Sequence, residues 1–463
     1  MMRRTIDFNQ INSVYFLGIG GIGMSAIARF FKSQGKVVAG YDKTRTPLTD
    51  ELTAEGIDVR YVDDPTTIHE FFSDPSSTLV VLTPAIPKDH QEWAHFLKND
   101  FPILKRSEVL GIITANFFTI AVAGTHGKTT TSTLIAHLLK DAGIDCTAFL
   151  GGISKNYKTN LLLGSAQDGR HIVVVEADEY DRSFLTLFPD VAIITSMDPD
   201  HLDIYGSEEE MKETYRRFAG QVKTSGQLIY KKGLPIGLVP APAIDYSLYG
   251  PADQYASAIV IRDHQYRFDW TNGQDTYFDL TTQLPGQHNV ENAIAAIAAV
   301  RAVGLTESAI RKGLASYTGV RRRFDYQVRS AEHIYIDDYA HHPEELRACI
   351  ASARDLYPGR AITGIFQPHL FTRTRDFVDG FAKSLSMLDR LILLDIYPAR
   401  ELPIPGVTSN MIFEKVSSPT KVLLKKEDVV NYLKNEPPDV LLTLGAGDID
   451  QLVDPIREMI SNT

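Results

Sequence analysis

A glycine turn followed by lysine and threonine is the strongest chemical signal in the sequence. Residues 121–131 read AVAGTHGKTTT, with an apolar run before the glycines and a helical pattern after them. Amides at a helix start hold anionic oxygens, a lysine neutralises phosphate charge, and a threonine hydroxyl can bind Mg²⁺. Val122 stands where the standard pattern has glycine, so an unrelated turn remains the alternative. The predicted ATP-binding loop comprises Gly124, Thr125, His126, Gly127, Lys128, Thr129 and Thr130.

Two acidic segments could complete the metal chemistry that a phosphate loop needs. Residues 176–181 read EADEYD and residues 198–203 read DPDHLD, and each segment follows an apolar run. Mg²⁺ prefers oxygen ligands and tolerates an occasional imidazole, so Glu176 and His201 are candidate ligands. The alternative is a solvated helix start for the charges and a structural role for the histidine. Their position after strands, beside a phosphate loop, favours the metal site.

A second glycine turn lies near the N-terminus. Gly18, Gly20 and Gly23 follow an apolar run at residues 14–17, and Asp42 ends the next predicted strand. This spacing is typical of backbone that approaches a pyrophosphate, with an acidic residue about 20 positions later for a ribose. NAD and a UDP-sugar both carry a pyrophosphate and a ribose. The local chemistry therefore leaves both ligands open.

The elements that position these residues follow a regular alternation. Short β-branched runs alternate with helical patterns, which indicates an α/β fold with parallel sheets. The predicted strands are residues 14–17, 36–40, 79–82, 103–106, 118–123, 171–175, 191–195, 334–336, 361–366, 391–394 and 440–444. Residues 24–34 and 292–301 predict helices, and Asn272-Gly273 predicts a hairpin within residues 256–280. Because ligands bind at the carboxyl ends of parallel strands, we expect the polar residues there to share a site.

Composition excludes several classes of protein. The 463 residues have room for about three domains, and 44% hydrophobic with 23% charged residues is ordinary globular usage. No apolar run approaches the ~18 residues of a membrane helix, so we expect no membrane insertion. A net charge of −11 argues against binding to nucleic acid.

The N-terminal segment and the cysteines bear on the compartment. Residues 5–10 after the basic N-terminus are mixed and polar, so no secretory segment is predicted and we expect a cytoplasmic protein. The two cysteines, Cys146 and Cys349, cannot form a disulfide framework, and we expect buried free thiols.

Three domains are predicted, with boundaries where one set of strands ends and where a basic loop interrupts the pattern. They comprise residues 1–114, 115–320 and 321–463. The middle domain carries the phosphate loop and turns β-rich after residue 256.

With these motifs in order, the chain resembles the Mur ligases. The resemblance rests on residues 18–25, 124–131, 176–181, 200–203, 286–292, 322–324, 337–343 and 367–369. It implies a Rossmann-like UDP-sugar domain, a central phosphate-loop ATPase domain and a Rossmann-like C-terminal ligase domain. It also implies that ATP and Mg²⁺ support ligation of L-alanine to the lactyl carboxylate of UDP-N-acetylmuramate, through an acyl phosphate, in peptidoglycan precursor synthesis.

The resemblance implies roles for residues of the middle domain. Lys128 is similar to a phosphate contact and Thr129 to a magnesium contact, while Glu176 and His201 are similar to ligands of a second magnesium. The implied catalytic residues are Lys128, Glu176, His201 and Arg373.

Further ATP contacts are implied near the second boundary. Asn289 and Asn292 resemble the pair beside the adenine, and Arg323 resembles a phosphate contact. Asp338 and His341 resemble the nucleotide contacts of the last domain. As alternatives, Asn292 starts a helix and Arg323 is a solvated linker charge.

Substrate contacts complete the set that the resemblance implies. Arg373 resembles an arginine that serves the carboxylate substrates, although Leu370 stands where many relatives have arginine. The implied UDP-sugar contacts are Gly18, Gly20, Gly21, Gly23, Asp42, Thr83 and Arg106.

Three rival functions stay open. A recycling ligase that attaches a tripeptide to the same UDP-sugar shares the EADEYD segment. A nicotinamide dehydrogenase explains the first glycine turn but not the phosphate loop, and a phosphate-loop motor explains Lys128 but not the turn. The segment 367–376 favours the alanine ligase.

Overall fold

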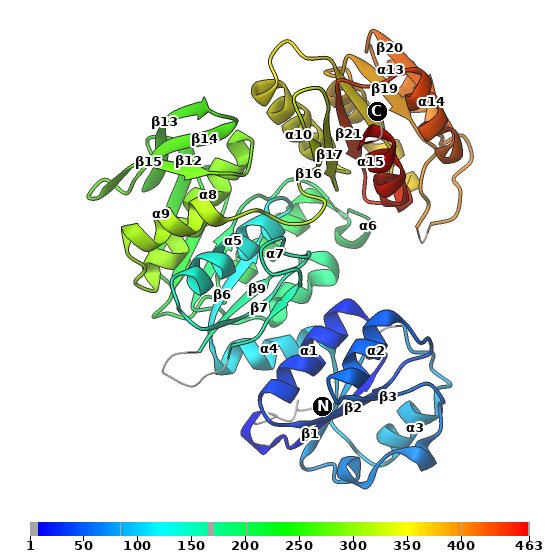
Figure 1. The fold of residues 1–463 in the computed structure, drawn as a ribbon. Helices are drawn as coiled ribbons and strands as arrows, with labels where there is room; N and C mark the ends of the chain where they lie inside the picture. The colour runs from blue at the N-terminus through cyan, green and yellow to red at the C-terminus, as the bar shows by residue number, and fades with distance from the viewer. Residues whose placement is uncertain (1–7, 84, 165–170, 201, 400, 462–463) are drawn as a thin grey trace. The chain divides into compact units, whose positions relative to one another are not determined.

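The computed structural model describes residues 8–83, 85–164, 171–200, 202–399 and 401–461, and the chain is coloured along its length in Figure 1. Two compact units divide it. The first comprises Met1–Gly152, Tyr157–Tyr246 and Ala295–Ile310, and the second comprises Ile153–Asn156, Ser247–Ile294 and Arg311–Thr463.

The N-terminal part of the first unit is a five-stranded parallel sheet of order β3-β2-β1-β4-β5. Its strands are β1 (Ser13–Leu17), β2 (Val37–Tyr41), β3 (Asp58–Arg60), β4 (Thr78–Leu82) and β5 (Ile103–Lys105). Its helices are α1 (Ile22–Ser33), α2 (Pro47–Ala54), α3 (Gln91–Lys98) and α4 (Arg106–Asn116).

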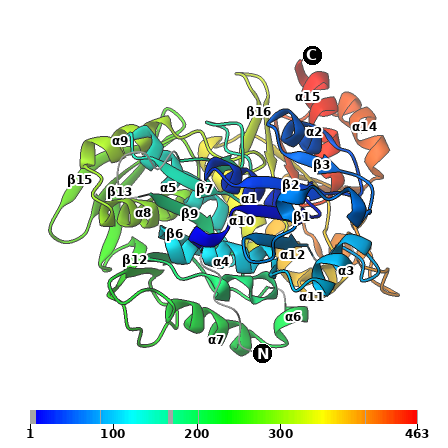
Figure 2. The same cartoon turned by 90° about the horizontal axis from the view of Figure 1, so that it is seen from below.

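Alternate side chains of β1 face two different layers of helices. Val14 and Phe16 pack in one buried cluster with Phe30 of α1, whereas Tyr15 and Phe96 of α3 belong to another. Because successive side chains of a strand point to opposite faces, helices cover both sides of this sheet (Figure 2).

A buried polar network ties α3 to the sheet. Glu92 is fully buried and accepts hydrogen bonds from the Tyr15 hydroxyl at 2.9 Å and from Arg60 at 2.8 Å. Burial raises the pKa of the Glu92 carboxyl to about 7, although Tyr15 and Arg60 favour its charged form. Such a group is costly to ionise in a sheet core.

The central part of the first unit holds strands in the order β12-β11-β10-β6-β9-β7-β8. They are β6 (Phe118–Ala123), β7 (Cys146–Phe149), β8 (Leu161–Leu162), β9 (Ile172–Glu176), β10 (Val191–Ile194), β11 (Gln227–Lys231) and β12 (Ala243–Tyr249). Its helices are α5 (Lys128–Asp141), α6 (Leu202–Tyr205) and α7 (Glu208–Ala219), with a 3-10 helix η4 (Tyr180–Thr186). The parallel strands β6 and β9 end beside one another, which places two loops at one sheet edge.

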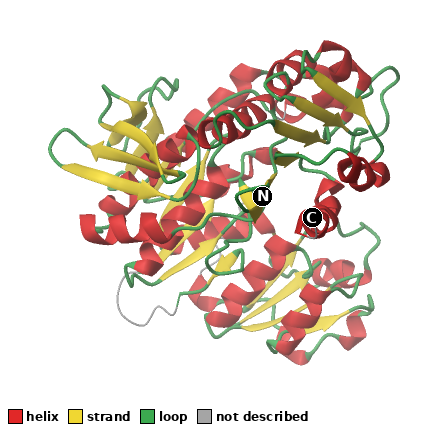
Figure 3. Cartoon of the chain, turned by 45° about the horizontal axis from the view of Figure 1, so that its top comes forward, coloured by secondary structure: helices red, strands yellow, loops and turns green. Residues whose placement is uncertain are grey.

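The second unit begins with long antiparallel strands, drawn in yellow in Figure 3, namely β13 (Gln254–Arg262), β14 (Gln265–Thr271) and β15 (Thr276–Thr282). The helices α8 (Gln287–Ala302) and α9 (Glu307–Ser316) follow along the chain, and their residues Ala295–Ile310 belong to the first unit. The six-stranded sheet of this unit has the order β16-β17-β21-β18-β19-β20. Only β16 is antiparallel to its neighbour.

The strands of this sheet are β16 (Asp325–Arg329), β17 (Ile334–Asp338), β18 (Ile362–Phe366), β19 (Arg390–Leu393), β20 (Thr420–Leu423) and β21 (Val440–Leu444). Its helices are α10 (Pro343–Leu356), α11 (Phe371–Asp376), α12 (Val378–Leu385), α13 (Asn410–Lys415), α14 (Val429–Asn435) and α15 (Val453–Ser461). His342 caps α10 through a bond from the Glu344 amide, and Pro343 occupies its first position.

The structure confirms the α/β class and has a strand at every predicted position, with some ends shifted by one or two residues. Arg106 was expected in a strand but starts α4, because Glu108 accepts a bond from the Lys105 amide and caps that helix. Thr114, the expected end of the first domain, lies within α4. Cys146 and Cys349 are buried free thiols, as predicted. Within the described ranges, every helix is too short or too polar to cross a bilayer.

The Glu92 network predicts a pH-dependent stability. The folded carboxyl has a pKa of about 7 and the unfolded one about 4.5, so the folded chain binds the extra proton and loses stability as the pH rises between these values. Between pH 5 and 7.5 the free energy of unfolding should fall by on the order of 1–3 kcal/mol in the wild type. In Glu92→Gln this fall should be absent.

Trp93, next to Glu92, reports this change. The chain has two tryptophans, so urea unfolding followed by Trp93 fluorescence in a Trp270→Phe background isolates this part of the chain. Glu70→Gln, at an exposed position, is the matched control. An unchanged pH slope in Glu92→Gln would contradict the assignment.

Candidate functional site

The N-terminal glycine turn is shaped by contacts that exclude side chains. Gly18 has φ +90°, and a Cβ there would lie 2.3 Å from Thr83 Cγ2. The Gly20 amide donates a 2.7 Å hydrogen bond to Asp42 Oδ2, and a Cβ on Gly20 would lie 2.8 Å from the same oxygen. The turn therefore brings Gly18, Gly20, Asp42 and Thr83 together. Asp42 shapes the turn, and its contact with a ribose stays a prediction.

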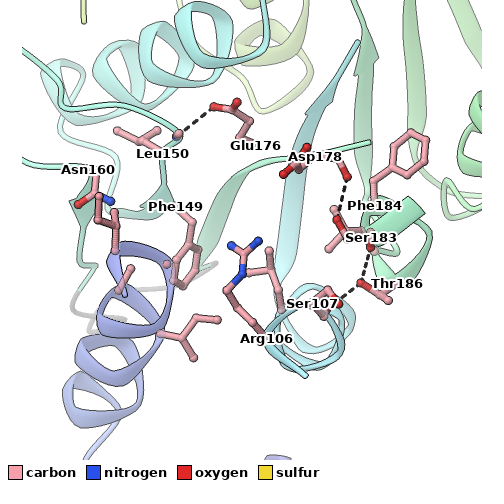
Figure 4. A pocket seen from close by; sticks show the side chains of 17 residues that line it. Arg106, Ser107, Phe149, Leu150, Asn160, Glu176, Asp178, Ser183, Phe184 and Thr186 are labelled. Carbon is pink, nitrogen blue, oxygen red and sulfur yellow. Dashed lines mark hydrogen bonds between the residues drawn. The ribbon is translucent and has the colours of Figure 1, made fainter. Parts of the chain in front are cut away.

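A pocket of about 200 Å³ extends from this turn to the central strands (Figure 4). Gly23 lies so close to Arg106 that a Cβ on Gly23 would be 2.8 Å from Arg106 Nη1. Other residues that line it are Ser107, Phe149, Gly151, Glu176, Asp178 and Thr186. The Thr186 hydroxyl donates to the Ser107 carbonyl at 2.7 Å, which ties α4 to η4. One wall is thus cationic and the other carries carboxylates, a suitable arrangement for an anionic ligand next to a metal.

The phosphate loop occupies the turn between β6 and α5. Its residues Gly124, Thr125, His126 and Gly127 form the turn, and Lys128, Thr129 and Thr130 begin the helix. Gly127 caps α5 at φ +83°, and a Cβ on Gly124 would lie 2.0 Å from Thr195 Oγ1. The Thr125 hydroxyl donates to the Asp198 carbonyl at 2.8 Å. These contacts shape the turn at the N-terminus of α5, where backbone amides can bind phosphate oxygens.

Lys128 forms a buried ion pair that sequence reasoning missed. Its ammonium lies 2.7 Å from Glu179 Oε2 and donates to the Gly124 carbonyl at 2.7 Å. Burial lowers the pKa of Lys128, but the charges of Glu179 and Glu176 outweigh it and raise that pKa above its ordinary value. Burial raises the pKa of Glu179 to about 7. The lysine is therefore cationic, and any phosphate it binds competes with Glu179.

Two oxygen ligands suited to Mg²⁺ lie beside the loop. The Thr129 hydroxyl donates to Glu176 Oε1 at 3.0 Å, and the Gly151 amide donates to Glu176 Oε2 at 3.0 Å. His201 lies outside the described residues, among which no three His, Cys, Asp or Glu side chains form a metal cluster. Mg²⁺ beside substrate phosphates needs only one or two protein carboxylates, so Thr129 and Glu176 fit such a site.

The remaining predicted residues belong to the second unit. Asn289 and Asn292 are buried in the first turns of α8, where Asn292 Nδ2 donates to Asn289 Oδ1 at 3.2 Å. His288 beside them is exposed. Desolvation by the surrounding residues, with the charges of Arg347 and Arg323, lowers the pKa of its imidazole below the ordinary value.

The carboxyl ends of β17 and β18 bring Arg323, Asp338, His341 and Arg373 to one edge of the sheet. Asp338 accepts 2.7 Å bonds from the amides of Phe324 and Ala340, and burial raises its pKa to about 6. His341 lies beside Tyr339, and burial lowers the pKa of His341 to about 4.

Arg373 is buried, and its Nη1 lies 3.5 Å from His369 Nδ1. Arg323 lies 3.8 Å from Glu345, which also accepts a bond from the His341 amide. Only tertiary structure reveals Glu179, His288 and Glu345 as parts of these clusters, although the first two lie in segments that the sequence singles out.

The Lys128 geometry predicts a specific loss of function. Lys128→Ala should lower ADP release from ATP on the order of a thousandfold, because a cation facing developing phosphoryl charge is lost. Lys128→Ala/Glu179→Gln removes the unpaired buried carboxylate, so it separates chemistry from misfolding. Lys140→Ala, on the same helix in a partly exposed pair with Asp145, is the control. Near-normal ADP release by the double variant would remove Lys128 from the mechanism.

Models of known protein families match most of the chain. The family models described as Mur ligase family, catalytic domain, Mur ligase middle domain, and Mur ligase, glutamate ligase domain match residues 13–118, 122–300 and 322–447.

Curated relatives extend the match to nearly the full length. A UDP-N-acetylmuramate–L-alanine ligase of Parabacteroides distasonis is 49% identical over 98% of both chains. One of Porphyromonas gingivalis W83 is 51% identical over 96% of this chain and 98% of its own. The crystal structure of UDP-N-acetylmuramate–alanine ligase from Thermotoga maritima, 27% identical, covers 97% of this chain and 99% of its own with a TM-score of 0.76. The chain belongs to the Mur ligase family.

Proposed function

We propose that this chain ligates L-alanine to the lactyl carboxylate of UDP-N-acetylmuramate, with conversion of ATP to ADP and phosphate, in peptidoglycan precursor synthesis. One observation carries the proposal, the pocket that joins Arg106 at the first glycine turn to Glu176 at the phosphate loop. Relatives about half identical over nearly the full length bear the name of this activity, which supports the substrate pair.

The proposed reaction has two steps, phosphoryl transfer and amide formation. A lactyl carboxylate oxygen attacks the γ-phosphorus of ATP, the bond to the β-phosphate oxygen breaks, and ADP leaves. The neutral amine of L-alanine then attacks the acyl carbon, loses a proton, and expels inorganic phosphate as the amide forms. Lys128 offsets the negative charge that gathers on the transferred phosphoryl group.

The metal site has a defined task in this proposal. Thr129, Glu176 and His201 would hold Mg²⁺, which would reduce the repulsion between carboxylate and triphosphate. The 3.0 Å contact between Thr129 Oγ1 and Glu176 Oε1 supports two of the three ligands.

Other residues are assigned by their chemistry. Asn289 and Asn292 offer amides for the adenine, and Arg323 and the neutral imidazole of His341 serve the phosphates. Asp338 would contact the nucleotide, and its carboxylate also accepts the Phe324 amide next to Arg323. Arg373 would pair with a substrate carboxylate. Gly18, Gly20, Gly21, Gly23, Asp42, Thr83 and Arg106 would bind the UDP-sugar.

The domain and compartment assignments complete the proposal. Residues 1–114 bind the UDP-sugar, residues 115–320 bind ATP, and residues 321–463 form the ligase domain. The enzyme would work in the cytoplasm, where ATP is available, on small-molecule substrates, without binding nucleic acid or inserting into a membrane.

Product analysis tests this function against its nearest rival. Purified protein is incubated with ATP, Mg²⁺, UDP-N-acetylmuramate and one amine donor, either L-alanine, glycine, L-serine or the tripeptide L-Ala-γ-D-Glu-meso-diaminopimelate. We expect mass spectrometry to find the alanyl product, formed mole for mole with ADP. Product from the tripeptide alone would identify the recycling ligase instead, and ADP release without any amide product would reject both.

A further inference from the structure

Arg322 is bound to three different strand and loop ends of the second unit. Its Nη2 donates to the Gly445 carbonyl at 2.7 Å, its Nε lies 3.3 Å from Asp337 Oδ2, and its Nη1 lies 3.4 Å from Asp450 Oδ2. A guanidinium has a rigid planar fork of donors, so contacts at three nitrogens define its orientation. Arg322 thereby ties the segment before β16 to the ends of β17 and β21.

The next residue, Arg323, packs against the same tyrosine ring as Arg322. The guanidinium carbons of Arg322 and Arg323 each lie 5.1 Å from the centroid of Tyr339. The Tyr339 amide donates to the Arg322 carbonyl at 2.7 Å. A shift of Arg322 would therefore move both the ring and the backbone on which Arg323 depends.

The backbone around Arg323 is a constrained turn. Arg322 has φ +60° and Phe324 has φ +45°, values that side chains rarely adopt. Asp338 accepts the Phe324 amide at 2.7 Å, and Asp325 accepts the Arg322 amide at 3.2 Å. Such a conformation persists only where surrounding contacts enforce it, and the Arg322 guanidinium supplies three of them.

The Asp337 partner is a buried carboxylate. It is 2% exposed, it accepts a 2.7 Å bond from the Thr443 hydroxyl, and burial raises its pKa. Loss of Arg322 would leave this carboxylate without its cation, so stability and positioning must be separated in any test.

We propose that Arg322 is a positioning residue that holds Arg323 in place for phosphoryl transfer, an inference that rests on the proposed ligase function. Arg322 contacts Asp337, Gly445 and Asp450. Among the described residues, the ion pair of Arg323 is with Glu345, at 3.8 Å. The first arginine anchors the turn and the second serves the substrate.

The first test compares Arg322→Ala with Arg321→Ala, its exposed neighbour of equal charge. Arg322→Ala should lower kcat about 10- to 100-fold, the effect of misplacing one group by an ångström, while the KM for L-alanine stays within about twofold. Arg321→Ala should keep wild-type kcat. A wild-type enzyme without turnover would reject the proposed function, whereas an active wild type with an equally active Arg322→Ala would reject only this inference.

Two double variants separate positioning from folding. Arg322→Ala/Asp337→Asn removes the uncompensated carboxylate and should recover the thermal stability lost in Arg322→Ala without recovering kcat. The second double variant combines Arg322→Ala with Arg323→Lys, which keeps a positive charge and should therefore retain some turnover. The fold-loss of kcat in this double variant should be well below the product of the two single losses, because Arg322 acts through Arg323. Recovery of kcat by the first double variant, or losses that multiply fully in the second, would overturn the proposal.

Discussion

Repulsion between a carboxylate and a triphosphate is the constraint that the proposed reaction must overcome, and the clusters around Lys128 and Glu176 respond to it. A lysine, a threonine hydroxyl and a carboxylate are held by the ends of β6 and β9, where glycines admit the close backbone contacts. Fixed charges arranged before the reaction need no reorganisation during it. The parallel pairing of β6 and β9 places these groups at the same edge of the sheet.

Buried pairs of opposite charge recur in the structure. Glu179 faces Lys128, Glu92 faces Arg60, and Asp337 faces Arg322, and each carboxylate has a raised pKa through burial. Removing one partner of such a pair leaves an uncompensated buried charge, which is costly. Each pair therefore favours the conformation in which its two side chains stay together. At Lys128 the pair also keeps an ammonium in a region that phosphate must enter.

Local motifs made much of the site predictable. The phosphate loop, the Gly18 turn and the Asn272-Gly273 hairpin depend on backbone conformations that particular residues permit at particular spacings, so the sequence alone indicated them. The partners of Lys128 and Arg322 were not predictable, because Glu179 and Gly445 reach them only through tertiary contact. Arg106 shows the intermediate case, since the carboxylate of Glu108, two residues later, caps a helix where β-rich sequence predicted a strand.

Transfer of a labelled oxygen tests the central claim, that the lactyl carboxylate attacks ATP. UDP-N-acetylmuramate with ¹⁸O in both carboxylate oxygens is incubated with the enzyme, ATP, Mg²⁺ and L-alanine, and the phosphate is analysed by mass spectrometry. Attack on the γ-phosphorus followed by displacement at carbon predicts one ¹⁸O in each inorganic phosphate released and one retained in the amide. Unlabelled phosphate, or ¹⁸O found in AMP, would contradict the account.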